Sequence, residues 1–405
     1  MHYKHEGTFV SIANTISTKA VVGAIKVIYA LPERVEGVTI AVDGDTLTIA
    51  GRDAWGSSVT VLTALPQDET KSPRERIAPV WVVDNQIRTI VETSSSRSDR
   101  SALTYSDGFL RFGSQFKVRA NKHDSSDEKL LNTQPTAAVS PTELKQALAI
   151  LAPHAVTTGS KPAVNVRIGT AADGSISVAV AGDYSAGTVA LNAIGGTSRR
   201  AAIGYAGIGV LAASAKLLKS SADQWTLTAA VTDSTCQTEI SDGTTTVIHN
   251  AQTAGMPDFD DALAEPDGLR CWDLDIADLS DFDRFLSVLP RVFSADGAFI
   301  QIRNTGQSHG AKHPIELVAR SGSNLAVAGD LLRGQSIPIV NTTSVDDVEV
   351  DVALPQMRQI VTSAMNAGGG TVTLRGYSPY ETMGKLFLRG KNVTAVTISR
   401  IPQPL

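Results

Sequence analysis

The feature that most constrains the fold is a unit that occurs three times along the 405 residues. In the first copy a turn precedes an alternating strand at residues 46–49, followed by a small residue, a glycine and Asp53. The second copy repeats this pattern at residues 174–183 and ends in Asp183, and a weaker third copy lies near residues 314–330. A repeat of roughly 130 residues is too long for one solenoid unit, so it predicts three similar domains.

Each predicted domain contains two amphipathic helices. In the fifth helix Leu279, Phe282 and Leu286 follow the spacing of a helix face that packs on a core. Ser17 is a suitable N-cap of the first, and Ser140 with Glu143 forms a capping-box pattern at the start of the third. The six helices are expected at residues 17–30, 84–93, 140–151, 208–218, 276–289 and 352–366.

Short strands with a period of two lie between the helices. They are separated by Asp-Gly turns, such as those at residues 43–44, 107–108 and 242–243, which are typical of antiparallel hairpins. Helices mixed with hairpins predict an α+β fold. Polar stretches at 121–135 and 265–268 are expected to link the domains, which we place at residues 1–134, 135–266 and 267–405.

The composition bounds the class of protein. An apolar content of 42% is enough for packed cores, and no apolar run reaches the ~18 residues of a membrane span. No signal-peptide pattern opens the chain, and Cys236 and Cys271 do not suggest a disulfide framework. We therefore expect a cytoplasmic protein with reduced thiols and no membrane association. The net charge of −5 argues against an overall basic protein and leaves room for a local basic surface.

No familiar catalytic or metal-binding signature appears in the sequence. There is no P-loop, dinucleotide-binding glycine set or nucleophile elbow. His309 and His313 are four residues apart, but Gly310 and Pro314 disfavour a helix, so a surface loop is expected there. The aspartates at 258, 260 and 261 are interpreted as exposed turn acids, and Asp53 and Asp183 as turn-capping residues. We expect no enzyme activity, cofactor or metal.

Four short segments resemble those of one protein family. Residues 47–53 look like a first-domain strand that ends in a Thr-Asp turn, and residues 180–183 look like its second-domain version. Residues 256–263 (Met-Pro-Asp-Phe-Asp-Asp-Ala-Leu) are similar to the family's aromatic-Pro-Asp-Tyr segment, and 393–401 match its last strand. With the repeated architecture, these resemble the bacterial-type β sliding clamp, the DNA polymerase III β subunit, over residues 8–401.

The chain departs from the family in two places. The family continues Gly-His-Arg-Leu in the second-domain turn, where this chain has residues 184–187 (Tyr-Ser-Ala-Gly), and its tail is of a Met-Pro-Met-Arg-Leu type, where this chain ends Ile-Pro-Gln-Pro-Leu. Both segments wall the family's partner-peptide cleft. A divergent, phage-encoded clamp with altered partner specificity fits this pattern, and so does a clamp-fold protein that has lost the usual partners.

The resemblance implies a non-enzymatic DNA processivity factor. The family forms a head-to-tail homodimer, a ring of six domains lined by twelve helices, through which duplex DNA threads without base readout. Basic residues on or after the predicted helices are therefore pore candidates, and ordinary solvated helix faces are the alternative. They are Lys19, Lys26, Arg34, Arg88, Lys145, Lys161, Lys216, Lys219, Arg284 and Arg358.

The resemblance also implies partner binding. Replicative polymerase and clamp loader would bind through short hydrophobic peptides in a cleft between the second and third domains. The positions that match the cleft are Val164, Pro257, Ala262, Ile398, Arg400 and Ile401. For Val164 and Ile398 plain sheet core is the alternative. The dimer would join domain one of one subunit to domain three of the other, edge strand to edge strand.

Two other classes of protein stay open. A phage capsid or tail protein fits the richness in Ala, Gly, Ser and Thr, but not six basic amphipathic helices at regular positions. An enzyme with an unrecognised site is disfavoured by the lack of any motif. Ring-shaped dimerisation separates the first hypothesis from both.

Overall fold

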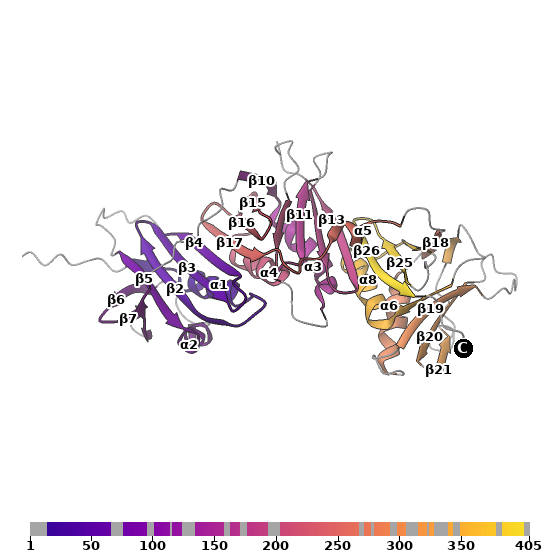
Figure 1. The fold of residues 1–405 in the computed structure, drawn as a ribbon, viewed down its shortest axis with the longest axis horizontal. Coiled ribbons are helices and arrows are strands. Elements are labelled where there is room, and N and C mark those ends of the chain that lie inside the picture. Colours follow the sequence, from indigo (N-terminus) through magenta and orange to yellow (C-terminus); the bar gives the residue numbers. More distant parts are fainter. Residues whose placement is uncertain are drawn as a thin grey trace, which may run out of the picture. The chain divides into compact units, whose positions relative to one another are not determined.

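The computed structural model shows the expected mixture of helices and sheets (Figure 1). It describes residues 14–65, 76–94, 101–113, 116–123, 134–157, 163–170, 176–192, 203–266, 271–276, 279–291, 298–304, 315–321, 324–327, 339–342, 349–377 and 383–400.

The chain divides into two compact units. Unit 1 comprises residues 1–142, 161–164 and 193–255, and unit 2 comprises residues 143–160, 165–192 and 256–405. The predicted middle domain, 135–266, therefore contributes to both units. The division into three domains stays a prediction, whereas the α+β class is seen in each unit.

The part of unit 1 that the structure describes contains three helices and two antiparallel sheets. One sheet has the strand order β1-β6-β7-β8, and the other has the order β10-β15-β16-β17-β4-β3-β2-β5-β9. The elements of its first part are β1 (Asn14–Ile16), α1 (Thr18–Ile28), β2 (Val35–Asp43), β3 (Thr46–Asp53), β4 (Ser58–Ala64), β5 (Ile77–Val83), α2 (Asp84–Ser94), β6 (Ser101–Ser106), β7 (Phe109–Phe112), β8 (Phe116–Arg119), β9 (Asn121–Lys122) and β10 (Gln134–Val139). Those of its second part are β14 (Ile203–Ala206), α4 (Ile208–Leu217), β15 (Trp225–Val231), β16 (Thr235–Ser241) and β17 (Thr245–Gln252).

Unit 2 repeats the same kinds of element. Its main strand order is β11-β12-β13-β26-β23-β19-β20-β21, and β18, β22, β24 and β25 complete the sheet. From the middle of the chain come α3 (Pro141–Leu151), η1 (Ala152–Ala155), β11 (Val166–Thr170), β12 (Ile176–Ala181), β13 (Ser185–Leu191) and α5 (Phe259–Leu263). The last part adds β18 (Cys271–Ile276), α6 (Leu279–Val288), η2 (Leu289–Arg291), β19 (Ala298–Asn304), β20 (Ile315–Ser321), β21 (Asn324–Val327), β22 (Ile339–Thr342), β23 (Glu349–Ala353), α8 (Leu354–Asn366), β24 (Val372–Tyr377), β25 (Met383–Arg389) and β26 (Val393–Arg400).

All six predicted helices are confirmed: they are α1, α2, α3, α4, α6 and α8. The Ser17 side chain accepts a hydrogen bond from the amide of Ala20 and caps α1, as expected. In α6 the apolar stripe Leu279, Phe282 and Leu286 is buried. The period of the apolar residues therefore places each of these faces on the core.

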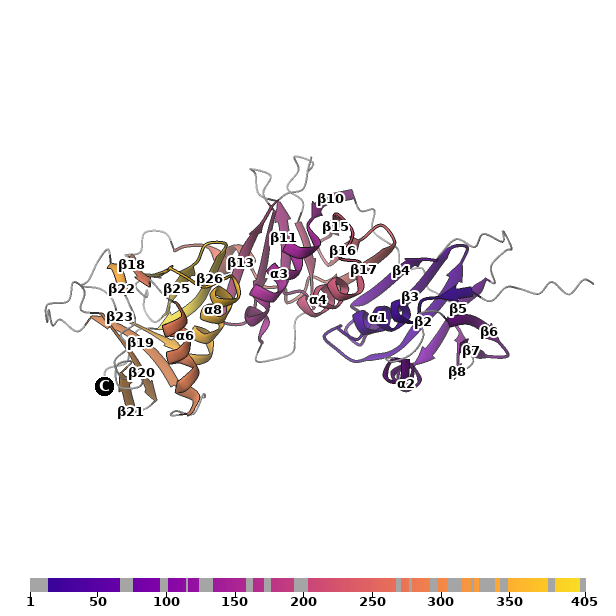
Figure 2. The same ribbon diagram turned by 180° about the vertical axis from the view of Figure 1, so that it is seen from behind.

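In unit 1, helices α1 and α4 pack against each other and lie side by side in both ribbon views (Figures 1 and 2). Glycine permits the close approach. A methyl group on Gly23 would come within 2.6 Å of Leu217 Cδ1, and one on Gly209 would come within 3.0 Å of the Ala30 carbonyl oxygen. The contacts join the middle of α1 to the end of α4 and the end of α1 to the start of α4, so the two helices run antiparallel.

Sheet pairing crosses the predicted domain boundaries in the same way in both units. In unit 1, β4 pairs with β17, from Ser58 opposite Asn250 to Thr63 opposite Thr245. In unit 2, β13 pairs with β26, from Ser185 opposite Thr397 to Val189 opposite Val393. In each case the third strand after the first helix of one predicted domain pairs with the last strand of the next.

Two strands are left without such a pairing: β8 in predicted domain one and β21 in predicted domain three. Both lie at sheet edges in the described residues. β8, the third strand after the second helix of predicted domain one, as β17 and β26 are in their domains, pairs with β7 and ends its sheet. β21, the third strand after the first helix of predicted domain three, pairs with β20 and also ends its sheet. Within the described residues, each therefore has one strand neighbour.

The turn chemistry agrees with the sequence analysis. Asp53 Oδ1 accepts hydrogen bonds from the amides of Trp55 and Ser57 at 3.0 and 2.9 Å, which confirms its capping role. Gly44, Gly108 and Gly243 have positive φ angles in the Asp-Gly turns, a conformation that glycine adopts without steric cost. Asp183 is exposed at its turn.

Candidate nucleic-acid interface

Three of the predicted basic residues of unit 1 lie on two packed helices. Lys19 and Lys26 are exposed on α1, on the side away from its buried residues, and Lys216 is exposed near the end of α4. Lys219 follows α4, where Asp242 fixes the loop by accepting a hydrogen bond from the Lys219 amide at 2.7 Å. Neither α1 nor α4 contains an acidic residue, so this helix pair presents positive charge only.

A carboxylate organises the basic residues around α2. Asp84 Oδ1 accepts hydrogen bonds from the Tyr29 hydroxyl at 2.5 Å and from Arg88 Nε at 2.8 Å. The Arg88 guanidinium also lies 4.9 Å from the centre of the Tyr29 ring, a cation–π distance. Burial alone would raise the pKa of Asp84, but the hydrogen bonds from Tyr29 and Arg88, with the nearby charge of Arg34, lower it. Asp84 is therefore ionised at neutral pH and offsets part of the local positive charge.

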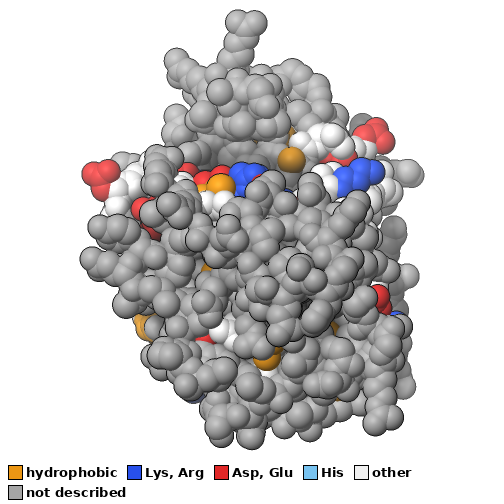
Figure 3. Space-filling model, turned by 90° about the vertical axis from the view of Figure 1, so that its right-hand side faces the viewer, with side chains coloured by type: hydrophobic (Ala, Val, Ile, Leu, Met, Phe, Trp, Pro, Cys, Tyr) orange, Lys and Arg blue, Asp and Glu red, His pale blue; other side chains and the backbone are white. Residues whose placement is uncertain are grey.

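The helices of unit 2 carry a weaker basic signal. Arg358 is exposed on α8, whereas Lys145 on α3 is only half-exposed. Arg284 on α6 lies 3.6 Å from Asp281 Oδ1, and Asp283 is on the same helix. In the end-on view of Figure 3, described basic and acidic side chains occur next to each other. The predicted basic set is thus concentrated on unit 1, and Lys161 lies outside the described residues.

The predicted partner segment forms a short helix instead of a plain turn. Asp258 caps α5 by accepting hydrogen bonds from the amides of Asp260 and Asp261, whose side chains are 88% and 82% exposed. Arg167 on β11 bonds Asp260 Oδ1 at 2.6 Å and lies 5.3 Å from the centre of the buried Phe259 ring. The acids are exposed as expected, and the segment is fixed to β12 and β13.

Four of the six predicted cleft residues can be placed with their side chains. Pro257, Ala262 and Ile398 are half-buried in unit 2. Val164 is 1% exposed, which agrees with the alternative of a core position. The backbone of Arg400 ends β26. Its side chain, like Ile401 as a whole, lies outside what the structure describes. A role of these positions in partner binding stays a prediction.

The turn between β12 and β13 is tightly held in unit 2. The carbonyl oxygen of Tyr184 accepts hydrogen bonds from Thr397 Oγ1 at 3.1 Å and from the Ile398 amide at 3.3 Å. Ser185 Oγ donates to Gln359 Oε1 at 2.7 Å and lies 3.1 Å from His154 Nδ1. The Tyr184 side chain is 44% exposed. An aromatic side chain is therefore presented to solvent from a fixed backbone, at the place where the sequence departs from the family.

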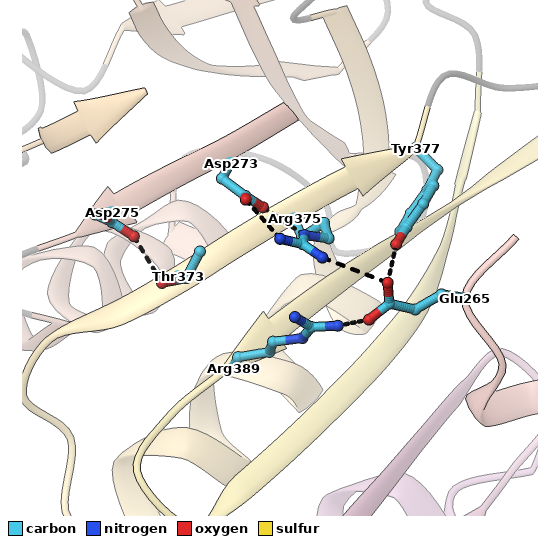
Figure 4. A network of polar contacts seen from close by, with 7 residues as sticks. All are labelled: Glu265, Asp273, Asp275, Thr373, Arg375, Tyr377 and Arg389. Carbon is cyan, nitrogen blue, oxygen red and sulfur yellow. Dashed lines mark hydrogen bonds and ion pairs between the residues drawn. The ribbon is translucent and has the colours of Figure 1, made fainter. Parts of the chain in front are cut away.

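A polar network that the sequence analysis missed anchors the segment after α5 (Figure 4). Glu265, interpreted as part of a polar stretch that links two domains, contacts Arg375, Arg389 and Tyr377 on β24 and β25. Arg375 also bonds both oxygens of Asp273 on β18, at 2.6 and 2.7 Å. The hydrogen bonds to Asp273 raise the pKa of Arg375. No local pattern joins residues more than 100 positions apart, so sequence reasoning had no signal for this network.

The described residues contain no group of three or more His, Cys, Asp or Glu placed to hold a metal. Burial lowers the pKa of both His154 and His249 to about 4 and raises that of Cys236 to about 11, so these groups are neutral at pH 7. His309 and His313 lie outside the described residues. No helix within the described ranges is long and apolar enough to cross a bilayer.

No protein-family model matches the sequence, and no curated protein sequence matches it. The structure nevertheless matches solved sliding clamps along nearly their whole length. The DNA polymerase sliding clamp of Pseudomonas aeruginosa is 11% identical, with a TM-score of 0.64 over 96% of this chain and 99% of that one. The DNA polymerase β subunit of Streptococcus pyogenes is 12% identical, with the same score and coverage. The sliding clamp of Bacillus subtilis is 11% identical, with a TM-score of 0.63 over 96% and 99%. The chain therefore has the fold of the bacterial β sliding clamps, at very low sequence identity.

Proposed function

We propose that this protein is a DNA sliding clamp, a non-enzymatic processivity factor that encircles duplex DNA. The observation that carries the proposal is the match of 96% of the chain to complete β clamps, such as that of Pseudomonas aeruginosa. The basic helices of unit 1 support it. A protein held on DNA by topology needs only weak attraction to phosphate, and three exposed lysines on α1 and α4 without a carboxylate supply such attraction.

The internal pairing supports a head-to-tail dimer. Twice within the chain, the third strand after the first helix of one predicted domain pairs with the third strand after the second helix of the next, as β4 with β17 and β13 with β26. By the same rule β21 of one subunit would pair with β8 of the partner, and both strands end their sheets. A heterologous contact of this kind closes a ring when its rotation permits. We propose that two copies do so and form six domains in all.

Duplex DNA would pass along the helices without base readout. Lys19, Lys26 and Lys216 would contact phosphates through exposed, flexible side chains, which suits sliding because each contact is readily exchanged. Arg34, Arg88, Lys145, Lys161, Lys219, Arg284 and Arg358 remain candidates of the same set. Arg88 and Arg284, whose charges Asp84 and Asp281 offset, would contribute less.

Replication partners would bind through short peptides near the β12–β13 turn. Pro257, Ala262 and Ile398 are half-buried there, and the exposed Tyr184 stands where related clamps have a different sequence. We propose that a polymerase and a clamp loader dock on these residues of unit 2, together with Arg400 and Ile401, with a peptide preference that Tyr184 alters.

The test is retention on circular DNA. The protein is loaded with its loader onto a nicked plasmid, isolated by gel filtration, and the plasmid is then cut once. A topological clamp stays on the circular plasmid and slides off the linear plasmid during a second gel filtration.

K19E/K26E/K216E should reduce loading at low salt. R52E/R76E/K391E, changed at exposed positions away from these helices, should not. Equal retention on circular and linear plasmid would exclude a sliding clamp and favour a phage structural protein that binds DNA directly.

A further inference from the structure

A second basic surface lies on the sheet β6-β7-β8, away from helix α2. Leu103, Leu110, Phe112 and Val118 are buried on one face of this sheet, and α2 packs against β8 on that side. Because side chains alternate along a strand, the other face carries the remaining positions. That face is not part of the helix surface assigned to duplex DNA.

Six positions form two rows across the three strands. In one row Thr104 lies opposite Arg111, and Arg111 lies opposite Lys117. In the other row Ser106 lies opposite Phe109, and Phe109 lies opposite Arg119. We call these six residues the β6–β8 face. Neighbouring strands are about 4.8 Å apart and alternate residues about 6.8 Å apart, so the whole face is only a few nucleotides in extent.

The β6–β8 face is strongly positive and includes an aromatic ring. Arg111, Lys117 and Arg119 are exposed, and no carboxylate occupies any of its six positions. Within the described residues none of the three cations forms an ion pair, although Asp107 is exposed at the turn beside the second row. Phe109 is half-buried, and Lys117 Nζ lies 4.0 Å from its ring centre, which places the ring on the solvent side of the sheet.

We propose that the β6–β8 face binds single-stranded nucleic acid, independently of the helix surface. Single strands are bound by cations that follow the backbone and by aromatic rings on which unstacked bases lie. Arg111, Lys117 and Arg119 supply the first, and Phe109 supplies the second. A duplex keeps its base faces stacked inside, so it could use the cations but not the ring. An acidic peptide would bind through the cations alone. For such a partner a further cation would be more useful than the aromatic ring at position 109.

The test measures binding of a short fluorescein-labelled oligothymidylate by anisotropy over a series of salt concentrations. R111Q/K117Q/R119Q should bind far more weakly, with a salt slope smaller by about 2, since each phosphate contact on a single strand contributes about 0.7. F109L, which keeps an apolar side chain but removes the stacking ring, should weaken binding about tenfold. An abasic oligomer should bind the original protein and F109L equally.

The matched control is R52Q/R76Q/K391Q, which removes the same charge at exposed positions outside the β6–β8 face. Equal loss of binding in both triple variants would show a general charge effect and overturn the proposal. A glutamate-rich peptide that binds as tightly as the oligomer, with no effect of F109L, would assign the face to an acidic protein partner instead.

A second measurement covers the case in which the triple variant fails to fold. Ultraviolet cross-linking with an iodouracil-substituted oligomer should label Phe109 in the unaltered protein, whereas labelling confined to α1 or α4 would contradict the proposal. Retention of R111Q, a change on β7 and not on the edge strand β8, on a circular plasmid should stay normal. Oligomer binding by an original protein that is not retained on the circle would argue against the duplex clamp and not against this face.

Discussion

Two histidines, His154 and His249, are buried without a full set of hydrogen bonds, and we expect them to contribute to the response of the protein to acid. His249 on β17 lies opposite Val59 and Thr238, and neither of its ring nitrogens has a partner within the described residues. Burial lowers its pKa, and that of His154, to about 4. An unfolded chain binds the proton below about pH 6.5. The free energy of unfolding is therefore unaffected by these histidines above that pH. It decreases as the pH falls toward 4, by up to about 3 kcal/mol for each histidine.

The residue-scale prediction is that His249→Leu reduces the sensitivity to acid. Leucine cannot be protonated and has a volume similar to that of histidine, so the variant should keep its stability at pH 7. Between about pH 6.5 and pH 4 it should lose less stability than the original protein, because one of two buried histidines is gone. Thermal melts at several pH values measure the difference. Parallel curves for the two proteins would show that His249 does not titrate on unfolding.

At the scale of elements, α2 has a basic residue, Arg88, whose positive charge is partly offset by an acidic residue on the same helix. Asp84 binds Arg88 four residues later and Tyr29, the residue that follows α1, so the arginine is held in place and partly neutralised. On α6, Asp281 lies near Arg284 in the same way. The lysines of α1 and α4 have no such acid on their own helices. Weak DNA attraction would therefore come mainly from α1 and α4.

Asp84→Asn should strengthen binding of duplex DNA at low salt. The change removes one negative charge beside Arg88 and Arg34, so the affinity should rise a few-fold and the salt slope should steepen by up to about 1. Anisotropy with a labelled duplex measures both quantities. Tyr29→Phe removes only the hydroxyl bond to Asp84 and is the control, with no expected change. Weaker binding by the Asp84 variant would show that Asp84 positions Arg88 for phosphate instead of competing with it.

The elements themselves were predictable from the sequence, and the contacts between them were not. Helices α1 and α6 were predicted because the apolar period, caps and stops are local signals. The β4–β17 and β13–β26 pairings and the Glu265 network depend on residues far apart in the chain. The same holds for the burial of Val164 and the half-exposure of Lys145, since a single helix or strand does not show what its neighbours cover.

At the scale of the whole molecule, the clamp fold is present at 11–12% identity. An apolar pattern of the right period tolerates many substitutions as long as volume and position are kept. The sequence resemblance relied on a few short segments, whereas the structure matches 96% of the chain. The proposed joining of two subunits rests on the strand pairing within the chain, which leaves β8 and β21 at sheet edges.

Head-to-tail association predicts a cross-linking pattern. In a C271S background, R119C and N324C place one cysteine at the end of β8 and one at the start of β21. Neither variant alone should form covalent dimers with a short bis-maleimide. In a contact between β8 of one subunit and β21 of the other, a single variant has a cysteine on only one of the two strands. A mixture of the two should form dimers. Dimers from R119C alone would show a head-to-head contact and contradict the pairing rule.

The most direct measurement is negative-stain electron microscopy of the purified protein at low salt. The account predicts closed rings with a central hole wide enough for a duplex and a two-fold axis that gives a pseudo-six-fold outline. Compact particles without a hole, or fibres and sheets built by the same β8–β21 contact without closure, would contradict the clamp and favour a structural role for this fold.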